Sequence, residues 1–439
     1  MPISCITSGS ILHTGCSGSM FNNTMSIDQK GSRDALTIRF HEHIRDIPRQ
    51  DWDRLSLGTE TPLLEWEWLR CMEESGSISP EEGWIPHHIG VYDNDRLVGA
   101  APLYVKTHSM GEFVFDFAFA DVAHQLGASY YPKLVGMSPA TPSSAFAFLT
   151  EDGPHEAEIQ AVMAASILEM AEETGMGGVA FNFADPKWMN GAGKAALEQY
   201  DFVGWTHQLY HWRNRGFTSF DDYLACFTKN QRRNIRRERE SMDRQGISIV
   251  IRTGDDITPE LLDYMYDFYA AHNARFGPWA AKFLNRQFFR MLADGFRDRI
   301  ALVCAYSREQ CATGEHSLHG QRPIAMAFLL VKNHTMWGRY WGADEDIRDL
   351  HFNCCYYKPI EWAIENGYEL FDPGMGSSHK VRRGFEAVSG YSLHHFMDER
   401  MQYILHNNID RINSMESAHV EQLNAARPVQ DNPYRGVAG

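Results

Sequence analysis

The stretch 371–385 concentrates residue types that can bind and transform an acyl group. Gly374 and Gly376 can present backbone N–H groups to an anion or an oxyanion. The acidic and imidazole side chains are candidate proton acceptors, and the basic ones can neutralise a phosphate or a developing negative charge. A basic connection from a strand to a helix is the alternative, but it requires fewer such residues. The candidate catalytic residues are Asp372, His379, Lys380 and Arg383.

A second candidate site is a cationic stripe on a helix predicted from Thr228 to Arg244. Its basic residues recur at spacings of three, four, seven and eight, which places them on one helical face. Clustered arginines suit phosphate, so the stripe predicts a site for tRNA or a nucleotide-linked acceptor. A solvated face neutralised by nearby glutamates is the alternative. The stripe consists of Lys229, Arg232, Arg233, Arg236 and Arg237.

A third candidate is a substrate rim formed by the segment 106–116 and the Tyr-Tyr-Pro-Lys run at 130–133. Its polar residues are Lys106, His108, Tyr131 and Lys133. The same segment carries phenylalanines at every second position, which is typical of a strand packed in a core. We therefore expect Phe113, Phe115, Phe117 and Phe119 to be core residues.

Composition excludes several classes of protein. The 439 residues include 41 basic and 57 acidic ones, a net charge of −16, which disfavours a generic polyanion binder but not one local basic site. No apolar run is long enough to span a membrane, and no secretory signal is present at the N-terminus, so we expect a cytoplasmic protein without membrane insertion. The eight cysteines form no C-x-x-C pair, and the histidines lack metal-binding spacing, so we expect no metal site.

The chain alternates predicted strands and helices, which indicates an α/β or α+β class. A predicted hairpin at 87–106 is echoed by the segments 301–306 and 322–330, and this weak repeat suggests two domains of one architecture. The last strand is expected at 368–371. We divide the chain into a disordered leader (1–34), two domains (35–212 and 213–400), and a C-terminal helix with a loose tail (401–439).

Several long runs in this order resemble the bacterial FemAB-like family of the GNAT acyltransferase superfamily. They include Gly-Trp-Ile-Pro-His-His at 83–88, Ala-Pro-Leu-Tyr-Val-Lys-Thr-His-Ser-Met-Gly-Glu-Phe-Val-Phe-Asp at 101–116, Tyr-Tyr-Pro-Lys at 130–133, Gly-Arg-Tyr-Trp-Gly at 338–342 and the His-Lys and Arg-Gly-Phe runs between 379 and 385. The resemblance covers about residues 36–400. It implies two tandem GNAT-like domains, each with a mixed central sheet flanked by helices.

The resemblance also implies an activity, because Fem-type enzymes move an aminoacyl group from aminoacyl-tRNA to an amine. His379-Lys380 and Gly384-Phe385 look like a diverged form of the family's final segment, and Arg339 joins the substrate-binding candidates. Two departures are expected to alter substrate choice. Ser377-Ser378 replaces a frequent Gly-Glu, so position 378 offers no carboxylate base, and Phe146 stands near a frequent arginine.

Three functions follow as hypotheses. The first is a Fem-type transferase that uses aminoacyl-tRNA and acylates an amine of a small molecule, peptide or cell-wall precursor, without a resident cofactor. The second is a CoA-dependent N-acyltransferase, although the acidic loop at 343–349 lacks the glycine spacing that cradles pyrophosphate. The third is a non-catalytic binding protein of the same fold. The sequence leaves the donor, the acceptor and the oligomeric state open.

Overall fold

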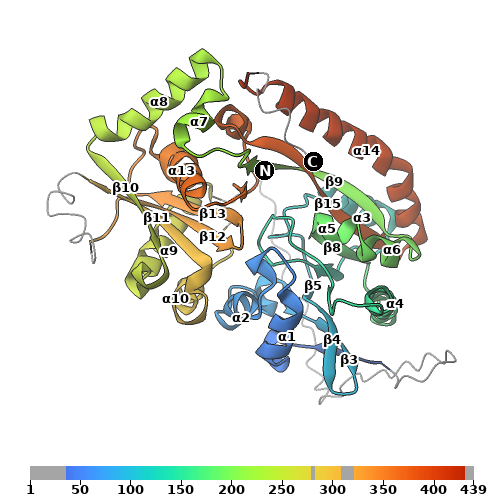
Figure 1. Cartoon of the computed structure of the whole chain (residues 1–439). Helices are drawn as coiled ribbons and strands as arrows, with labels where there is room; N and C mark the ends of the chain where they lie inside the picture. Colours follow the sequence, from blue (N-terminus) through green and yellow to red (C-terminus); the bar gives the residue numbers. More distant parts are fainter. Residues whose placement is uncertain (1–35, 278–281, 308–320, 431–439) are drawn as a thin grey trace, which may run out of the picture.

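A mixed α/β fold is seen in the computed structural model, which describes residues 36–277, 282–307 and 321–430 (Figure 1). The predicted leader (1–34) and the end of the predicted tail (431–439) lie outside these residues. Within them, no helix has the length and apolar character needed to cross a membrane. The expected class, with mixed sheets flanked by helices, is confirmed.

A large sheet runs through the molecule and contains eleven strands of the described residues. In spatial order these are β10 (Ile247–Thr253), β11 (Ile300–Ser307), β12 (Ala325–Lys332), β13 (Thr335–Ala343), β14 (Leu370–Asp372), β9 (Val203–Arg213), β15 (Glu386–Phe396), β8 (Gly178–Ala184), β6 (Lys133–Gly136), β5 (Leu103–Lys106) and β2 (Trp84–Pro86). A second sheet has the order β1 (Thr37–His41), β3 (His88–Asp93), β4 (Arg96–Ala101) and β7 (Leu149–Thr150).

The helices cover both faces of the large sheet. They are α1 (Arg49–Ser56), α2 (Trp66–Glu74), α3 (Phe117–Leu126), α4 (Glu156–Glu173), α5 (Pro186–Met189), α6 (Ala192–Glu198), α7 (Phe220–Ala225), α8 (Lys229–Arg244), α9 (Pro259–Ala274), α10 (Arg286–Gly295), α12 (Leu350–Phe352), α13 (Lys358–Glu365) and α14 (Glu399–Ala425). In Figure 1, α9 and α10 lie on one side of β10–β13 and α13 lies on the other. Alternate residues of β11 and β12 accordingly enter two separate cores, as the two-residue period of a strand requires.

Two predictions about strands are wrong. The phenylalanines of 113–119 do not form a core strand, because Phe113 and Phe115 have positive φ angles of 60° and 58°, and α3 begins at Phe117. Only Phe119 of the four is buried, whereas Phe115 and Phe117 are 65% and 54% exposed. The strand at 370–372 is also not the last one, because β15 follows it.

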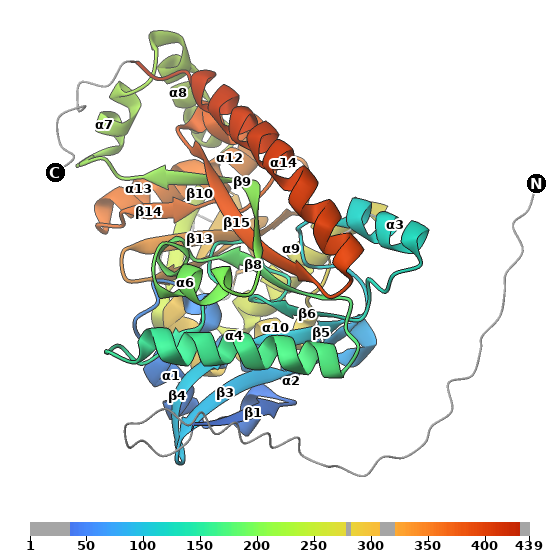
Figure 2. The ribbon, with the colours of Figure 1, turned by 90° about the vertical axis from the view of Figure 1, so that its right-hand side faces the viewer.

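The sheet continues across the boundary expected at residue 212, which lies one residue before the end of β9. We call residues 36–213 the N-terminal half and residues 214–430 the C-terminal half. β15 belongs to the C-terminal half, yet it pairs antiparallel with β9 on one side and with β8 on the other. Figure 2 shows α14 crossing these strands, and Asn413 on α14 accepts a hydrogen bond from the Thr206 N–H at 2.8 Å.

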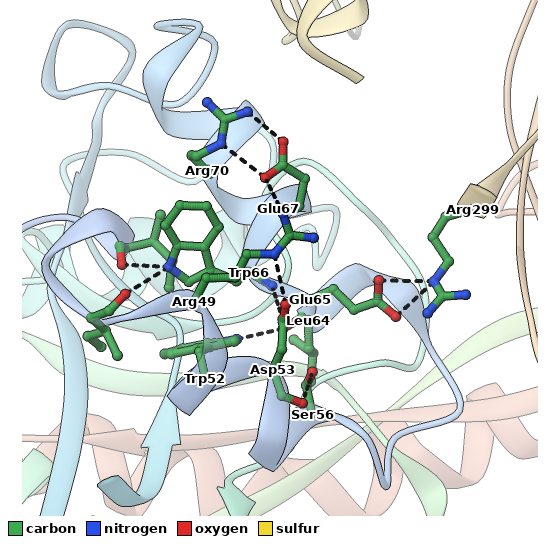
Figure 3. Close-up of polar contacts among 12 residues, drawn as sticks. Arg49, Trp52, Asp53, Ser56, Leu64, Glu65, Trp66, Glu67, Arg70 and Arg299 are labelled. Carbon is green, nitrogen blue, oxygen red and sulfur yellow. Dashed lines mark hydrogen bonds and ion pairs between the residues drawn. The ribbon is translucent and has the colours of Figure 1, made fainter. Parts of the chain in front are cut away.

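The two halves are also joined at α2 and at Glu65, the residue directly before it. Glu65 accepts two hydrogen bonds of 3.0 Å from Nε of Arg299, as Figure 3 shows. Lys332 on β12 forms a further ion pair with Glu65 at 3.1 Å. Beside this ionic contact, the ring of Trp68 packs edge-on against Phe288 with centroids 5.2 Å apart. These contacts fix the relative position of the surfaces that enclose the cavity described next.

Candidate functional site

A cavity of about 690 Å³ lies between the two halves. The N-terminal half contributes Phe113, Ala140 and Pro142 to its wall. The C-terminal half contributes residues from α9, the segment before α10, β12, β13, the α12–α13 region and the loop after β14. These are Tyr269, His272, Asn273, Phe276, Phe283, Leu284, Ala327, Phe328, Leu329, Gly338, Arg339, Tyr340, Trp341, His351, Cys355, Tyr356, Pro373, Gly374, Met375, Gly376, Ser377, His379 and Lys380. The stretch singled out first in the sequence therefore forms one side of this cavity.

The glycine loop is held in place by Asp372, at the end of β14. One carboxylate oxygen accepts a 2.7 Å hydrogen bond from the Gly374 N–H, and the other accepts one from the Ser143 hydroxyl at 2.5 Å. Arg339 forms an ion pair with the same carboxylate at 3.2 Å. Asp372 does not itself line the cavity. Its geometry therefore suits positioning of the loop more than proton transfer to a bound substrate.

A β-bulge explains why Arg339 reaches this loop. In the β12–β13 pairing, Tyr340 lies opposite Phe328 while Gly338 lies opposite Leu329, so Arg339 has no partner residue across the ladder. A bulge of this kind re-aims a side chain and is frequent beside active sites. Here four successive residues of β13, from Gly338 to Trp341, line the cavity.

Lys380 is a buried lysine in the wall of the cavity. It lies in the short 3₁₀-helix Ser378–Arg383. Its side chain donates a hydrogen bond to the Met375 carbonyl at 3.0 Å, and its ammonium lies 5.2 Å from the centroid of the Tyr210 ring. Burial lowers the pKa of Lys380 to about 8, although Asp372 opposes this shift. Gly376 lies directly beside it, since a Cβ there would be 3.2 Å from Nζ. The φ angle of Gly376, +127°, independently favours glycine.

His379 is held by hydrogen bonds at both ring nitrogens. Nε2 contacts the Tyr356 hydroxyl at 2.9 Å, and Nδ1 contacts the Ser377 hydroxyl. Burial, together with Lys380 and Arg383, lowers the pKa of His379 to about 4, so the ring is neutral at neutral pH. A neutral imidazole bonded to the exposed Ser377 hydroxyl can receive a proton through that hydroxyl. The sequence analysis did not identify Ser377 or Tyr356 as members of the site, and it noted Ser377 only as a departure from the family pattern.

Arg383 faces away from the cavity and connects its wall to α8. It donates to the His379 carbonyl at 3.0 Å and forms an ion pair with Glu238 of α8 at 3.0 Å. Its guanidinium also lies 3.3 Å from the centroid of the Phe352 ring. Arg383 is 5% exposed. This arrangement fixes the segment that carries Lys380 and leaves Arg383 without a path to substrate.

The cationic stripe lies on the opposite, outer face of α8. Its five basic residues line a surface hollow of about 540 Å³, together with Asp221, Ala225 and Glu240. Arg236 forms a 3.5 Å ion pair with Asp221. Within the described residues, no ion pair is found for Lys229, Arg233 or Arg237. The hollow therefore keeps a positive charge on a protein whose net charge is −16.

The four polar residues of the third candidate group do not line the cavity, although Phe113 of the same segment does. Two of the four, Lys106 and Lys133, are buried in the N-terminal half. Lys133 forms ion pairs with Glu112 at 2.8 Å and with Asp116, and it is 5% exposed. Lys106 is fully buried, donates to the Met110 carbonyl at 3.1 Å and lies 3.5 Å from the centroid of the Trp84 ring. Burial lowers the pKa of Lys106 to about 7. The side chains of Lys106 and Lys133 therefore bind partners inside the protein.

The remaining members of that group make local contacts. The Tyr131 hydroxyl bonds the Ser109 hydroxyl at 2.7 Å, and His108 Nδ1 accepts from the Met110 N–H at 3.2 Å. The structure therefore brings together Gly374, Gly376, His379, Lys380 and Arg339 at the cavity. It places the α8 stripe and the group around Lys106 elsewhere.

The acidic loop that follows β13 is closed by an ion pair. Arg322 bonds both carboxylate oxygens of Asp344, at 2.6 and 2.8 Å. Glu345 and Asp346 follow directly, so a pyrophosphate at this loop would meet carboxylates. Among the described residues, no group of three or more His, Cys, Asp or Glu side chains is arranged to hold a metal ion.

Several solved structures are similar to this chain at low sequence identity. FemX is 12% identical with a TM-score of 0.49, and the match covers 82% of this chain and 98% of FemX. L-PGS from Bacillus licheniformis is 12% identical with a TM-score of 0.44, over 78% of this chain and 95% of that one. A tandem GNAT protein from the clavulanic acid biosynthesis pathway is 13% identical with a TM-score of 0.43, over 82% and 98%.

The assignment to a family comes from the sequence itself. No curated protein matches it. The model of the FemAB-like family, described as peptidoglycan biosynthesis/recognition, matches residues 43–431. That range contains the whole cavity wall and the α8 stripe. The chain belongs to the FemAB-like family.

Proposed function

We propose that this chain is a Fem-type acyltransferase that moves an aminoacyl group from aminoacyl-tRNA to an amine. The observation that carries the proposal is Lys380, a buried lysine whose ammonium lies beside a glycine loop in the wall of a large cavity. Membership of the FemAB-like family supports a transferase activity. The acceptor is a small molecule, a peptide or a cell-wall precursor with a free amine.

The chemistry requires stabilisation of an oxyanion and transfer of one proton. The amine nitrogen attacks the ester carbonyl carbon, and the carbonyl oxygen becomes negatively charged. The Lys380 ammonium is placed to neutralise that charge, because it lies in the cavity wall and is shielded from water. The Gly374 N–H is already bonded to Asp372, so the following N–H groups of the loop are the better candidates to assist it.

The proton of the attacking amine passes to His379 through the Ser377 hydroxyl, which bonds Nδ1 of the imidazole. Collapse of the adduct forms the amide bond and breaks the ester bond. The proton is then returned to the departing ribose oxygen of the tRNA. Asp372 and Arg383 act by holding the loop and the 3₁₀-helix in position.

The α8 stripe supplies a surface for the tRNA backbone. Phosphates bind well to clustered, exposed basic side chains, and in the hollow on α8 no ion pair is found for Lys229, Arg233 or Arg237 among the described residues. Glu238 on the inner face of the same helix bonds Arg383, next to the segment that carries Lys380. RNA bound outside α8 would therefore lie near the wall of the cavity that receives its aminoacyl end.

The pH profile distinguishes a charged Lys380 from a neutral one. If the ammonium stabilises the oxyanion, kcat/KM decreases as the pH rises through about 8, the pKa of Lys380, because the side chain loses its charge. Lys380→Arg moves this loss to higher pH, because a guanidinium stays charged. Comparing the two enzymes with one acceptor cancels the titration of the acceptor amine. A profile with activity rising through pH 8 in the wild type alone would contradict this role.

The donor is tested by incubating the protein with charged bulk tRNA, or with acetyl-CoA, in the presence of a cell extract. Loss of the aminoacyl ester that depends on Lys380 supports the proposal and identifies the amino acid. Consumption of acetyl-CoA alone would replace it with the CoA-dependent reaction, and failure of both donors would favour a binding protein.

Reversing two charges of the stripe, Arg233→Glu with Arg237→Glu, is expected to weaken tRNA binding by about tenfold or more and to reduce the salt slope by about 1 per lost contact. Filter binding across a salt series measures both. The matched control reverses Lys187 and Lys194, whose side chains are 76% and 59% exposed on α5 and α6. Equal losses in the two double variants would contradict a phosphate site on α8.

A further inference from the structure

One part of the cavity wall is a group of packed aromatic rings, Phe113, Tyr269, Phe283, Phe328 and Tyr340. Phe113 from the N-terminal half meets Phe283 edge-on, with ring centroids 5.7 Å apart. Deeper in the wall, Tyr269 and Tyr340 are 5.1 Å apart, and Phe328 lies 5.5 Å from Tyr340. The Tyr269 hydroxyl accepts the Phe283 N–H at 2.9 Å, which fixes this aromatic wall.

Charge is scarce in the cavity. None of the described residues that line it is an aspartate or a glutamate. Arg339 is paired with Asp372, which leaves Lys380 as the cation that faces the interior. The histidines add little charge, because burial lowers the pKa of His351 to about 3 and the pKa of His379 to about 4.

The aromatic wall and the scarcity of charged residues limit which acyl side chains can bind beside the reacting ester. A lysyl or arginyl side chain would be removed from water without a carboxylate partner, and a glutamyl or aspartyl side chain would compete with the oxyanion for Lys380. A small side chain would leave the aromatic wall without contacts. A volume of about 690 Å³ is ample for a large apolar group, whereas the body of a tRNA cannot enter.

We propose that the aminoacyl group carried into this cavity has a large uncharged side chain, either aromatic or branched aliphatic. The inference rests on the proposed aminoacyl transfer and specifies its substrate class. Phe113 and Phe283 are the specificity-determining residues, because their rings join the two halves of the chain in the wall of the cavity.

The test is direct binding of stable donor analogues, in which adenosine carries the aminoacyl group through an amide in place of the ester. Phenylalanyl, leucyl, alanyl, lysyl and glutamyl analogues are titrated into the full-length protein by calorimetry. The phenylalanyl and leucyl analogues are expected to bind about tenfold or more tightly than the alanyl one. Lysyl and glutamyl analogues are expected to bind no better than alanyl.

Phe113→Ala is expected to reduce the ratio of phenylalanyl to alanyl affinity by about tenfold. Phe115→Ala is the matched control, because Phe115 has nearly the same φ angle, 58° against 60°, but does not line the cavity. The control is expected to keep the wild-type ratio. Thermal unfolding of both variants separates a change of specificity from a loss of fold.

Two results overturn the inference. One is lysyl or glutamyl binding as tight as phenylalanyl, and the other is an equal ratio in the Phe113 and Phe115 variants. If bulk tRNA donates a small or charged amino acid in a reaction that depends on Lys380, the inference fails while the transferase proposal stands. If no analogue binds and no aminoacyl-tRNA is consumed, both fail together.

Discussion

Lys380→Ala is expected to reduce kcat for acyl transfer by about 100-fold to 1000-fold, the usual effect of removing one oxyanion-stabilising group. The loss falls on kcat because the ammonium interacts with charge that exists only in the transition state. Binding of the donor is expected to remain, since the aromatic wall and the α8 hollow are unchanged. Single-turnover kinetics with a charged tRNA, together with titration of the amide analogue, measure the two quantities separately.

The control for this variant is Lys187→Ala, which removes a side chain that is 76% exposed on α5. It is expected to retain wild-type turnover. Unfolding experiments are needed for both proteins, because Lys380 packs inside the cavity wall. If Lys380→Ala abolished binding of the analogue and left kcat unaltered, the lysine would be a binding group, and the oxyanion role would be lost.

Lys133→Ala is expected to lower the free energy of unfolding by about 3–5 kcal/mol, the usual cost of breaking a buried ion pair from one side. The change leaves the carboxylates of Glu112 and Asp116 without their cation. The loss is costly because both residues are only 1% exposed. Burial already raises the pKa of Glu112 in the presence of Lys133. Urea denaturation followed by circular dichroism measures the loss.

Two further variants serve as controls for the unfolding measurement on Lys133→Ala. Lys194→Ala removes an exposed ion pair with Glu198 and is expected to cost less than about 1 kcal/mol. Adding Glu112→Gln to Lys133→Ala neutralises one stranded carboxylate and is expected to recover part of the stability. If the single Lys133 variant were as stable as the Lys194 variant, the buried cluster would not be an important source of stability.

The part of the site that the sequence predicted is the part encoded locally. The glycines, His379 and Lys380 lie within seven residues, so residue types and spacing were sufficient to mark the loop. The α8 stripe was equally accessible, because a helical period relates its members. The expected α/β class followed from alternating strand and helix patterns, and the sheet topology confirms it.

The aromatic wall could not be predicted in this way. Phe113 and Phe283 are 170 positions apart, and an alternating phenylalanine pattern predicted a core strand where the backbone turns through two positive φ angles. Strand β15 escaped notice because polar residues interrupt its pattern, and Gly390 is needed where a Cβ would lie 2.4 Å from a methyl group of Leu209. The burial of Lys106 and Lys133 likewise depends on partners that fold around them.

The position of β15 matters while the protein is being made. β8 is buried along its whole length, and its neighbour on one side is a strand synthesised about two hundred residues later. At ordinary elongation rates this interval lasts roughly 10–40 s, during which a hydrophobic strand has an open edge. An open edge of this kind can pair with other chains until β15 is made, and a chain truncated before β15 would leave that edge of β8 unpaired.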